Sequence, residues 1–222
     1  MARALELALA GERLELMHER AVFLPDHATL LVADAHIGKA VSFRRLGVPV
    51  PRGTTTETLA TLSAAVDATG AERLIFLGDF LHSARARADA TLDALTRWRE
   101  RHVGLRLTLV RGNHDLHAGD PPKALGIDAV CEPLRLGALA RCHHPPTVEG
   151  AYVLAGHAHP CVVLGGRAQD RLRLPCFWFT DAARQAVGVL PAFGSFTGMH
   201  LIDRRREYRV FAVMPQRVIE LP

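Results

Sequence analysis

The fold is decided by three stretches of similar design, TLLVADAH (residues 29–36), ERLIFLGD (72–79) and LRLTLVRGNHD (105–115). Each is an apolar run of the length of a buried strand and ends in polar residues. Between them, TTTETLATLSAAVDAT (54–69), which stops at Gly70, and the amphipathic, Arg/Ala-rich segment 84–102 predict helices. This alternation of strand and helix favours a parallel sheet with helices packed on it.

The flanking sequence extends this picture on both sides. Residues 4–24 alternate apolar and polar residues around Gly11, which is typical of an antiparallel hairpin. After residue 115 the chain consists of short segments between Gly, Pro or Asp turns, such as AVCEPLRL (129–136) and YRVFAVM (208–214). We therefore expect an α/β fold, a two-sheet β-sandwich flanked by helices. No linker interrupts residues 1–222, so we expect one domain.

Composition narrows the class of protein. In 222 residues, no apolar run approaches the roughly 20 residues of a membrane helix, and the N-terminus does not have the pattern of a secretory signal. The four cysteines show no C-x-x-C spacing, which favours buried, reduced thiols and a cytoplasmic location. The net charge is +4, and only Lys39 and Lys123 are lysines. The arginines suit a phosphate-bearing partner, but a genome bias toward Ala and Arg explains them equally well.

Five short motifs carry most of the polar residues at the predicted strand ends. In chain order they are D-A-H (Asp34, His36), G-D-F-L-H (Asp79, His82), G-N-H-D (Asn113, His114, Asp115), H-H-P (His143, His144) and G-H-A-H (His157, His159). On an extended chain, residues two apart point to one face, so D-A-H and G-H-A-H each present two ligands together. Carboxylate, imidazole and amide ligands without thiolate suit Mn, Fe or Zn. Two metals about 3.5–4 Å apart form a clamp for phosphoryl chemistry.

In this order, the five motifs resemble those of the calcineurin-like metallophosphoesterases. The resemblance implies a two-sheet α/β sandwich around a dinuclear metal centre. By motif, it implies that one metal is bound by Asp34, His36 and His159, that the other is bound by Asn113, His157 and one histidine of H-H-P, and that Asp79 bridges both. It further implies that His114 contacts the phosphate, that Asp115 orients the His114 ring, and that His82 steadies a ligand.

The choice within H-H-P stays open on the residues alone. Adjacent side chains on a strand point in opposite directions, so only one of His143 and His144 can face the metals. Related phosphoesterases often have H-x-P with the first histidine as ligand, which favours His143 and leaves His144 at the rim or facing substrate. Lys39, Arg44 and Arg45 follow the first ligand pair and are candidate phosphate contacts, although solvated residues at a helix start would look the same.

A narrower resemblance covers nearly the whole chain. DAHIGKAVSFRRLGVPVPRGTT, GDFLHS, RGNHD, GHAHP, RLPCFWF and LPAFGSFTG look like the PdeM subfamily of ligase-associated DNA damage response endonucleases, which implies a DNA substrate and a DNA ligase and a helicase as partners. We expect a phosphodiesterase or nuclease with two divalent metals, Mn first and Fe, Zn or Mg as alternatives. The competing hypotheses are a small-molecule phosphodiesterase or nucleotide phosphatase, and a non-catalytic repair subunit. A homodimer is compatible with the sequence, but no feature argues for one.

Overall fold

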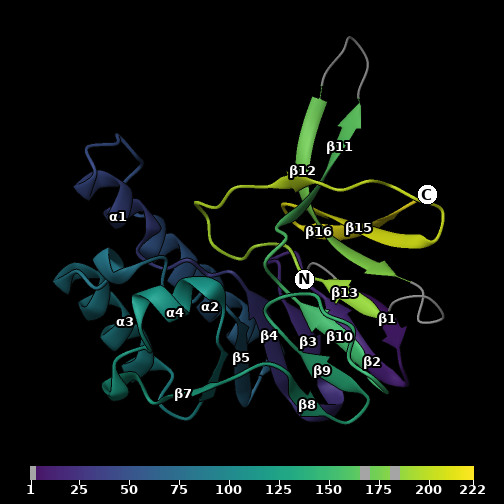
Figure 1. The fold of residues 1–222 in the computed structure, drawn as a ribbon, viewed down its shortest axis with the longest axis horizontal. Coiled ribbons are helices and arrows are strands. Elements are labelled where there is room, and N and C mark those ends of the chain that lie inside the picture. Colours follow the sequence, from purple (N-terminus) through teal and green to yellow (C-terminus); the bar gives the residue numbers. More distant parts are fainter. Residues whose placement is uncertain (1–3, 166–170, 181–185) are drawn as a thin grey trace.

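The computed structural model describes residues 4–165, 171–180 and 186–222. Two sheets pack face to face, and the helices lie beside the first sheet (Figure 1). One apolar core lies between the helices and the first sheet and includes Leu62, Phe76 and Trp98. A second core lies between the two sheets and includes Ile75 and Phe177. The predicted fold class, a two-sheet α/β sandwich, is confirmed.

In the part of the chain that the structure describes, the first sheet has seven strands in chain order. They are β1 (Leu5–Leu9), β2 (Glu12–Leu16), β3 (Val22–Leu24), β4 (Thr29–Ala33), β5 (Arg73–Leu77), β6 (Arg106–Val110) and β7 (Ile127–Val130). Strands β1 to β3 are antiparallel, as the hairpin pattern of residues 4–24 predicts; β3 also pairs with β4 antiparallel, and β4 to β7 are parallel. Ala33 pairs with Leu77, and Leu77 pairs with Val110. The carboxyl ends of β4, β5 and β6 are therefore level, which brings the residues that follow them together.

Among the described residues, four α-helices and three short 3-10 turns connect the strands. They are α1 (Lys39–Arg45), α2 (Thr54–Thr69), α3 (Asp89–Arg101), α4 (Asn113–Ala118), η1 (Pro25–His27), η2 (Ala84–Ala86) and η3 (Lys123–Leu125). Helix α2 has the predicted bounds and ends at Gly70, which adopts φ = 63°. The expected helix over 84–102 instead begins only at Asp89. Arg87, between η2 and α3, bonds to the carbonyls of Ala118 and Asp120, so a tertiary contact replaces the first helical turns.

The second sheet holds the remaining strands. They are β8 (Leu134–Leu136), β9 (Leu139–Arg141), β10 (Tyr152–Ala155), β11 (Pro160–Gly165), β12 (Arg171–Thr180), β13 (Val187–Val189), β14 (His200–Leu201), β15 (Tyr208–Met214) and β16 (Arg217–Leu221). The expected strand over 129–136 is two strands, since β7 belongs to the first sheet and β8 to the second. A bridge between Ala33 and Ala192 joins the end of β4 to the second half of the chain.

The composition predicts that the chain has no membrane-spanning helix and that its cysteines are buried and reduced. None of the helices in the described residues combines the length and the apolar character needed to span a membrane. Three of the four cysteines are buried and all are free, but Cys131 is exposed because it lies in the crossing between the two sheets.

Candidate metal centre

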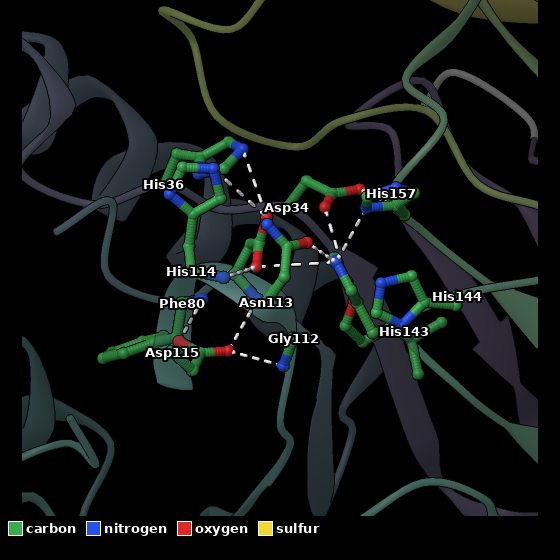
Figure 2. A network of polar contacts seen from close by, with 12 residues as sticks. Asp34, His36, Phe80, Gly112, Asn113, His114, Asp115, His143, His144 and His157 are labelled. Carbon is green, nitrogen blue, oxygen red and sulfur yellow. Dashed lines mark hydrogen bonds and ion pairs between the residues drawn. The ribbon is translucent and has the colours of Figure 1, made fainter. Parts of the chain in front are cut away.

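The candidate ligands lie just beyond the carboxyl ends of five strands. Figure 2 shows the side chains of Asp34, Asn113 and His143 close together in one network of polar contacts. Asp34 follows β4, Asp79 follows β5 and Asn113 follows β6; His143 follows β9 and His157 follows β10. The level ends of the first three strands place their side chains together, and the second sheet contributes the histidines. This is the edge at which open α/β sheets bind ligands.

The backbone at the site is left-handed, not extended. The angle φ is 53° at Asp34, 44° at His36, 52° at Asp79, 66° at His157 and 45° at His159. Residues with a Cβ rarely adopt this conformation, which costs about 1–2 kcal/mol per residue. The prediction that D-A-H and G-H-A-H are extended is therefore wrong: their paired side chains meet because the chain turns sharply at each of them. Such local strain is typical of functional sites.

Three glycines make room for the site. A Cβ on Gly78 would lie 2.1 Å from Nδ1 of His143, and one on Gly112 would lie 2.4 Å from Oδ1 of Asp79. A Cβ on Gly156 would lie 2.6 Å from Oδ2 of Asp34. The glycine that begins each of the motifs G-D, G-N-H-D and G-H-A-H is thus required for close approach.

His143 is fully buried and lies at the centre of a network of polar atoms. Its Nδ1 lies 3.1 Å from the carbonyl oxygen of Leu77, which only accepts, so Nδ1 donates. The bare Nε2 then faces other lone pairs, Oδ1 of Asn113 at 2.9 Å and Oδ1 of Asp79 at 3.5 Å. Nδ1 of His157 lies 3.1 Å from Nε2 of His143 and donates to it in one of the two neutral His157 tautomers. When such acceptor atoms are buried facing one another, their lone pairs repel, which is unfavourable unless a cation lies among them.

The two aspartates connect this network to a second one. Oδ1 of Asp34 is buried without a hydrogen bond to any described residue, 3.5 Å from Nε2 of His159. Asp79 turns Oδ1 toward His143 and Oδ2 toward Nε2 of His36, at 3.8 Å. Ligand atoms of Asp34, His36 and His159, and those of Asp34, Asp79 and His143, lie within 4.8 Å of one another. The donor set thus fits a divalent metal site, and Asp34 belongs to both groups of ligand atoms.

Asp115 does not orient the His114 ring. Its buried carboxylate accepts the backbone N–H of Asp79 at 2.7 Å, of Gly112 at 2.9 Å and of Phe80 at 3.0 Å (Figure 2). Burial raises the pKa of Asp115, and these three hydrogen bonds act in the opposite direction. The prediction fails because the sharp turns after β5 and β6 leave buried N–H groups that need an acceptor.

The partner of His114 is a backbone carbonyl instead. Nδ1 of His114 lies 2.7 Å from the carbonyl oxygen of His82, so Nδ1 donates and Nε2 is left facing the site, 3.9 Å from Oδ2 of Asp79. The His82 ring stacks on His114 and meets the edge of His36. Burial lowers the pKa of His82 to about 4, with smaller contributions from Lys39 and His114. The resemblance implies that His82 holds a metal ligand in position. The contacts of His82 with His114 and His36 agree with this role, which stays a prediction.

Glu132 is the residue that motif reasoning missed. Its Oε2 accepts the backbone N–H of His143 at 2.7 Å and that of His144 at 3.0 Å, and its Oε1 lies 2.8 Å from Nδ1 of His144. Burial raises the pKa of Glu132, but the hydrogen bonds from His144 and His143 outweigh it and hold the pKa below its usual value. Glu132 thereby fixes the turn that buries one histidine and leaves the other partly exposed, with 45% of the His144 side chain accessible.

The three basic candidates behave differently from one another. Lys39 begins α1 and is half-buried; burial lowers its pKa, and the charges of Asp34 and Asp79 oppose this. Arg44 and Arg45 end α1, exposed, and donate to the carbonyls of Pro51 and Arg85, respectively. Only Lys39 among them is near the two aspartates of the site.

Comparison with solved structures identifies a full-length relative. A nuclease named MPE from Pseudomonas putida is 42% identical, covers 98% of this chain and 100% of its own, and superposes with a TM-score of 0.86. A phosphoesterase from E. coli and a predicted phosphoesterase from Streptococcus pneumoniae, each 16% identical, cover 87% of this chain and 97% and 95% of their own, with TM-scores of 0.44 and 0.35. No protein-family model matches the sequence, and no curated protein does. By its full-length identity to the nuclease and its ordered motifs, the chain is a metal-dependent phosphoesterase and belongs to the calcineurin-like metallophosphoesterases.

Proposed function

We propose that this phosphoesterase is a nuclease that hydrolyses phosphodiester bonds in DNA with two divalent cations. The observation that carries the proposal is the buried set of opposed acceptors around Asp34, Asp79 and His143. Each of these side chains is almost fully inaccessible to water. Oδ1 of Asp79 accepts the backbone N–H of His114, but Oδ1 of Asp34 has no hydrogen bond to any described residue. A pair of cations would satisfy the remaining lone pairs, and a dinuclear centre of carboxylate, imidazole and amide ligands is suited to phosphoryl chemistry.

Each predicted ligand has a proposed place. One group consists of Asp34, His36 and His159, the other of Asn113, His143 and His157, with Asp79 shared. His143 is preferred over His144 because it is fully buried and its Nε2 faces Asn113 and Asp79. When bound, the two cations lower the pKa of water and neutralise charge on the phosphate. The protein contributes the fixed geometry: strained turns, close-fitting glycines and the Asp115 carboxylate that binds three N–H groups.

His114 is the proposed acid. Its ring is partly exposed, with 37% of the side chain accessible, and the His82 carbonyl fixes Nδ1–H. Nε2 is then the atom that meets substrate. In its protonated form, Nε2–H donates to the oxygen that leaves phosphorus and stabilises the charge developing there. Removal of such a donor typically costs about 10²–10³ in kcat.

The choice of nucleic acid as substrate rests on two supports. The full-length relative at 42% identity is named a nuclease, and nearly all the basic residues here are arginines, which bind phosphate in a bidentate manner. The PdeM resemblance motivates the finer proposals: a role in DNA repair, manganese as the native metal, and a DNA ligase and a helicase as partners. A small phosphodiester as the true substrate is the outcome that would refute the choice of nucleic acid.

The test is an assay of metal-stripped protein reloaded with Mn²⁺, using single-stranded DNA, double-stranded DNA, RNA and a cyclic nucleotide. Wild type should cleave DNA, and cleavage should fall steeply with salt. Asp79→Asn should abolish turnover, whereas Asp128→Asn, an equivalent change at an exposed position of β7, should retain it. Full activity of the chelator-treated protein would refute the metal mechanism. Faster, salt-insensitive turnover of the cyclic nucleotide would refute the DNA assignment.

A further inference from the structure

A small hollow lies next to the candidate metal centre. It is formed by the loop from Ala35 to Lys39, the first turn of α2 with Thr54 and Thr55, and the loop from Gly194 to Thr197. The space open to the centres of water-sized molecules is about 10 Å³. That is room for one water or one phosphate oxygen, and far too little for a nucleobase.

The His36 ring lines both the hollow and the metal centre. Its Nε2 lies on the metal side, 3.8 Å from Oδ2 of Asp79. Its Nδ1 is buried and has no hydrogen-bond partner among the described residues, and only 3% of the side chain is accessible. A metal-binding histidine normally donates its second N–H to an acceptor. An acceptor in the hollow would satisfy that unpaired group.

Two further features of the hollow favour a bound anion. Helix α2 has 16 residues and begins at Gly53 without a side-chain cap, so the first N–H groups, at Thr54 and Thr55, have no partner within the helix. These groups and the helix dipole favour an anion. Lys39 lines the same hollow, and none of the described residues forms a hydrogen bond or ion pair with its ammonium group. The hollow therefore combines a cation, N–H groups that have no partner within their helix, and an imidazole nitrogen that has no partner among the described residues.

The loop that closes the hollow is held in place. A Cβ on Gly194 would lie 2.5 Å from the carbonyl oxygen of Ala35, so glycine is required for this approach. The Arg20 guanidinium donates to the carbonyls of Ala192 and Gly194, and Ser195 bonds to Thr58 and Thr54. These bonds fix the Gly194 carbonyl and the Ser195 hydroxyl. The loop that borders the hollow is thus held in place, and Lys39, His36 and the start of α2 lie on the other two segments.

We infer that this hollow is a phosphate subsite: it takes in one oxygen of the phosphate next to the one that is cleaved in a nucleic-acid strand. The ligands are Lys39, the N-terminal turn of α2 and Nδ1–H of His36. The inference rests on the proposed nuclease function and deepens it, because it assigns recognition of a chain with at least two phosphates. A diester with a single phosphate occupies the metal centre and cannot reach the subsite.

The test compares two pairs of matched variants. Lys39→Gln is paired with Lys123→Gln, which removes the other lysine at an exposed site. Thr55→Glu adds a carboxylate in the hollow, and Thr56→Glu adds the same charge one residue along, at an exposed position outside it. The first readout is binding of a fluorescent single-stranded oligonucleotide to metal-free protein, over a range of salt. The second is Mn²⁺-dependent hydrolysis of the oligonucleotide relative to bis(p-nitrophenyl) phosphate.

Lys39→Gln and Thr55→Glu should each weaken oligonucleotide binding about tenfold, and Lys39→Gln should reduce the salt slope by about 1. Hydrolysis of the oligonucleotide should fall about tenfold more than that of the small diester, whereas both controls should bind and cleave like wild type. Binding equal to that of the controls would overturn the inference, as would equal losses on both substrates. If inorganic phosphate binds in the hollow as tightly as the oligonucleotide does, the hollow is a site for free anions and the inference is overturned. Failure of wild type to hydrolyse either substrate refutes the nuclease proposal, and the binding data still decide on the subsite.

Discussion

Substitution of Gly78 by alanine should selectively displace His143. The new Cβ would lie 2.1 Å from Nδ1, 2.4 Å from Cγ and 2.7 Å from Cβ of that ring. Ordinary contact begins at 3.4 Å, so the ring must move by the difference, about 1.3 Å, in a close-packed interior. That movement breaks the bond to the Leu77 carbonyl and takes Nε2 away from Asn113.

The stability cost has two parts. Gly78 adopts φ = 79°, and placing alanine there costs about 1–2 kcal/mol in backbone strain. Overpacking against the ring adds about 1–3 kcal/mol, so Gly78→Ala should lower the free energy of unfolding by about 2–5 kcal/mol. Gly150→Ala is the control that separates backbone strain from overpacking. Gly150 has φ = 70°, so alanine is strained there, but no atom lies within 4 Å of the new Cβ. Gly150→Ala should cost only about 1–2 kcal/mol.

The assays are guanidinium denaturation of both variants and measurement of bound Mn per chain by mass spectrometry after dialysis. Gly78→Ala should lose the metal held on the His143 side, and Gly150→Ala should keep the wild-type content. If the two variants lost the same stability and retained the same metal, the close approach of Gly78 to a ligand would be irrelevant and this account of the site would be refuted.

Three further predictions follow from individual contacts. His114→Gln should lower kcat about 10²–10³-fold with metal content unchanged; loss of metal along with activity would make His114 a ligand instead. His143→Ala should lose one metal by elemental analysis, whereas His144→Ala should keep both, and the reverse result would exchange their roles. The hydrogen bonds and charge of the Arg111 guanidinium lower the pKa of Asp120 below its usual 3.8. Since the folded-state pKa is the lower one, the pair stabilises the protein above that usual value, and the contribution is lost as the pH falls through the folded-state pKa. Asp120→Asn should therefore cost at most about 1 kcal/mol at neutral pH, because the pair is exposed, and the difference from wild type should vanish in strong acid; a gap independent of pH would contradict this origin.

The parts of the fold that local sequence determines were predictable. Helix α2 has the bounds given by its pattern and by Gly70, and the apolar runs of β4, β5 and β6 end where polar residues begin. The segment before α3 was not predictable, because Arg87 is held by carbonyls more than 30 residues away. Likewise, nothing local marks residues 131–133 as a crossing between two sheets.

The candidate site, too, was predictable only in part. The motifs identify which side chains converge, but the geometry assumed for them was wrong, because the turns at Asp34 and His157 are left-handed and the chain is not extended there. Asp115 lies in a recognisable motif, yet its partners are backbone N–H groups created by the tertiary turns. Glu132 has no motif at all. Its role depends on the arrival of residues 143 and 144 from another strand, and a single sequence gives no sign of that contact.

The most direct test of the central claim is anomalous X-ray diffraction at the manganese edge, from crystals of the protein grown with Mn²⁺. The account predicts two peaks about 3.5–4 Å apart, one beside Asp34, His36 and His159 and the other beside Asn113, His143 and His157, with Asp79 between them. No peak at this cluster, or a peak only at other residues, would contradict the assignment of the cluster as a dinuclear metal centre.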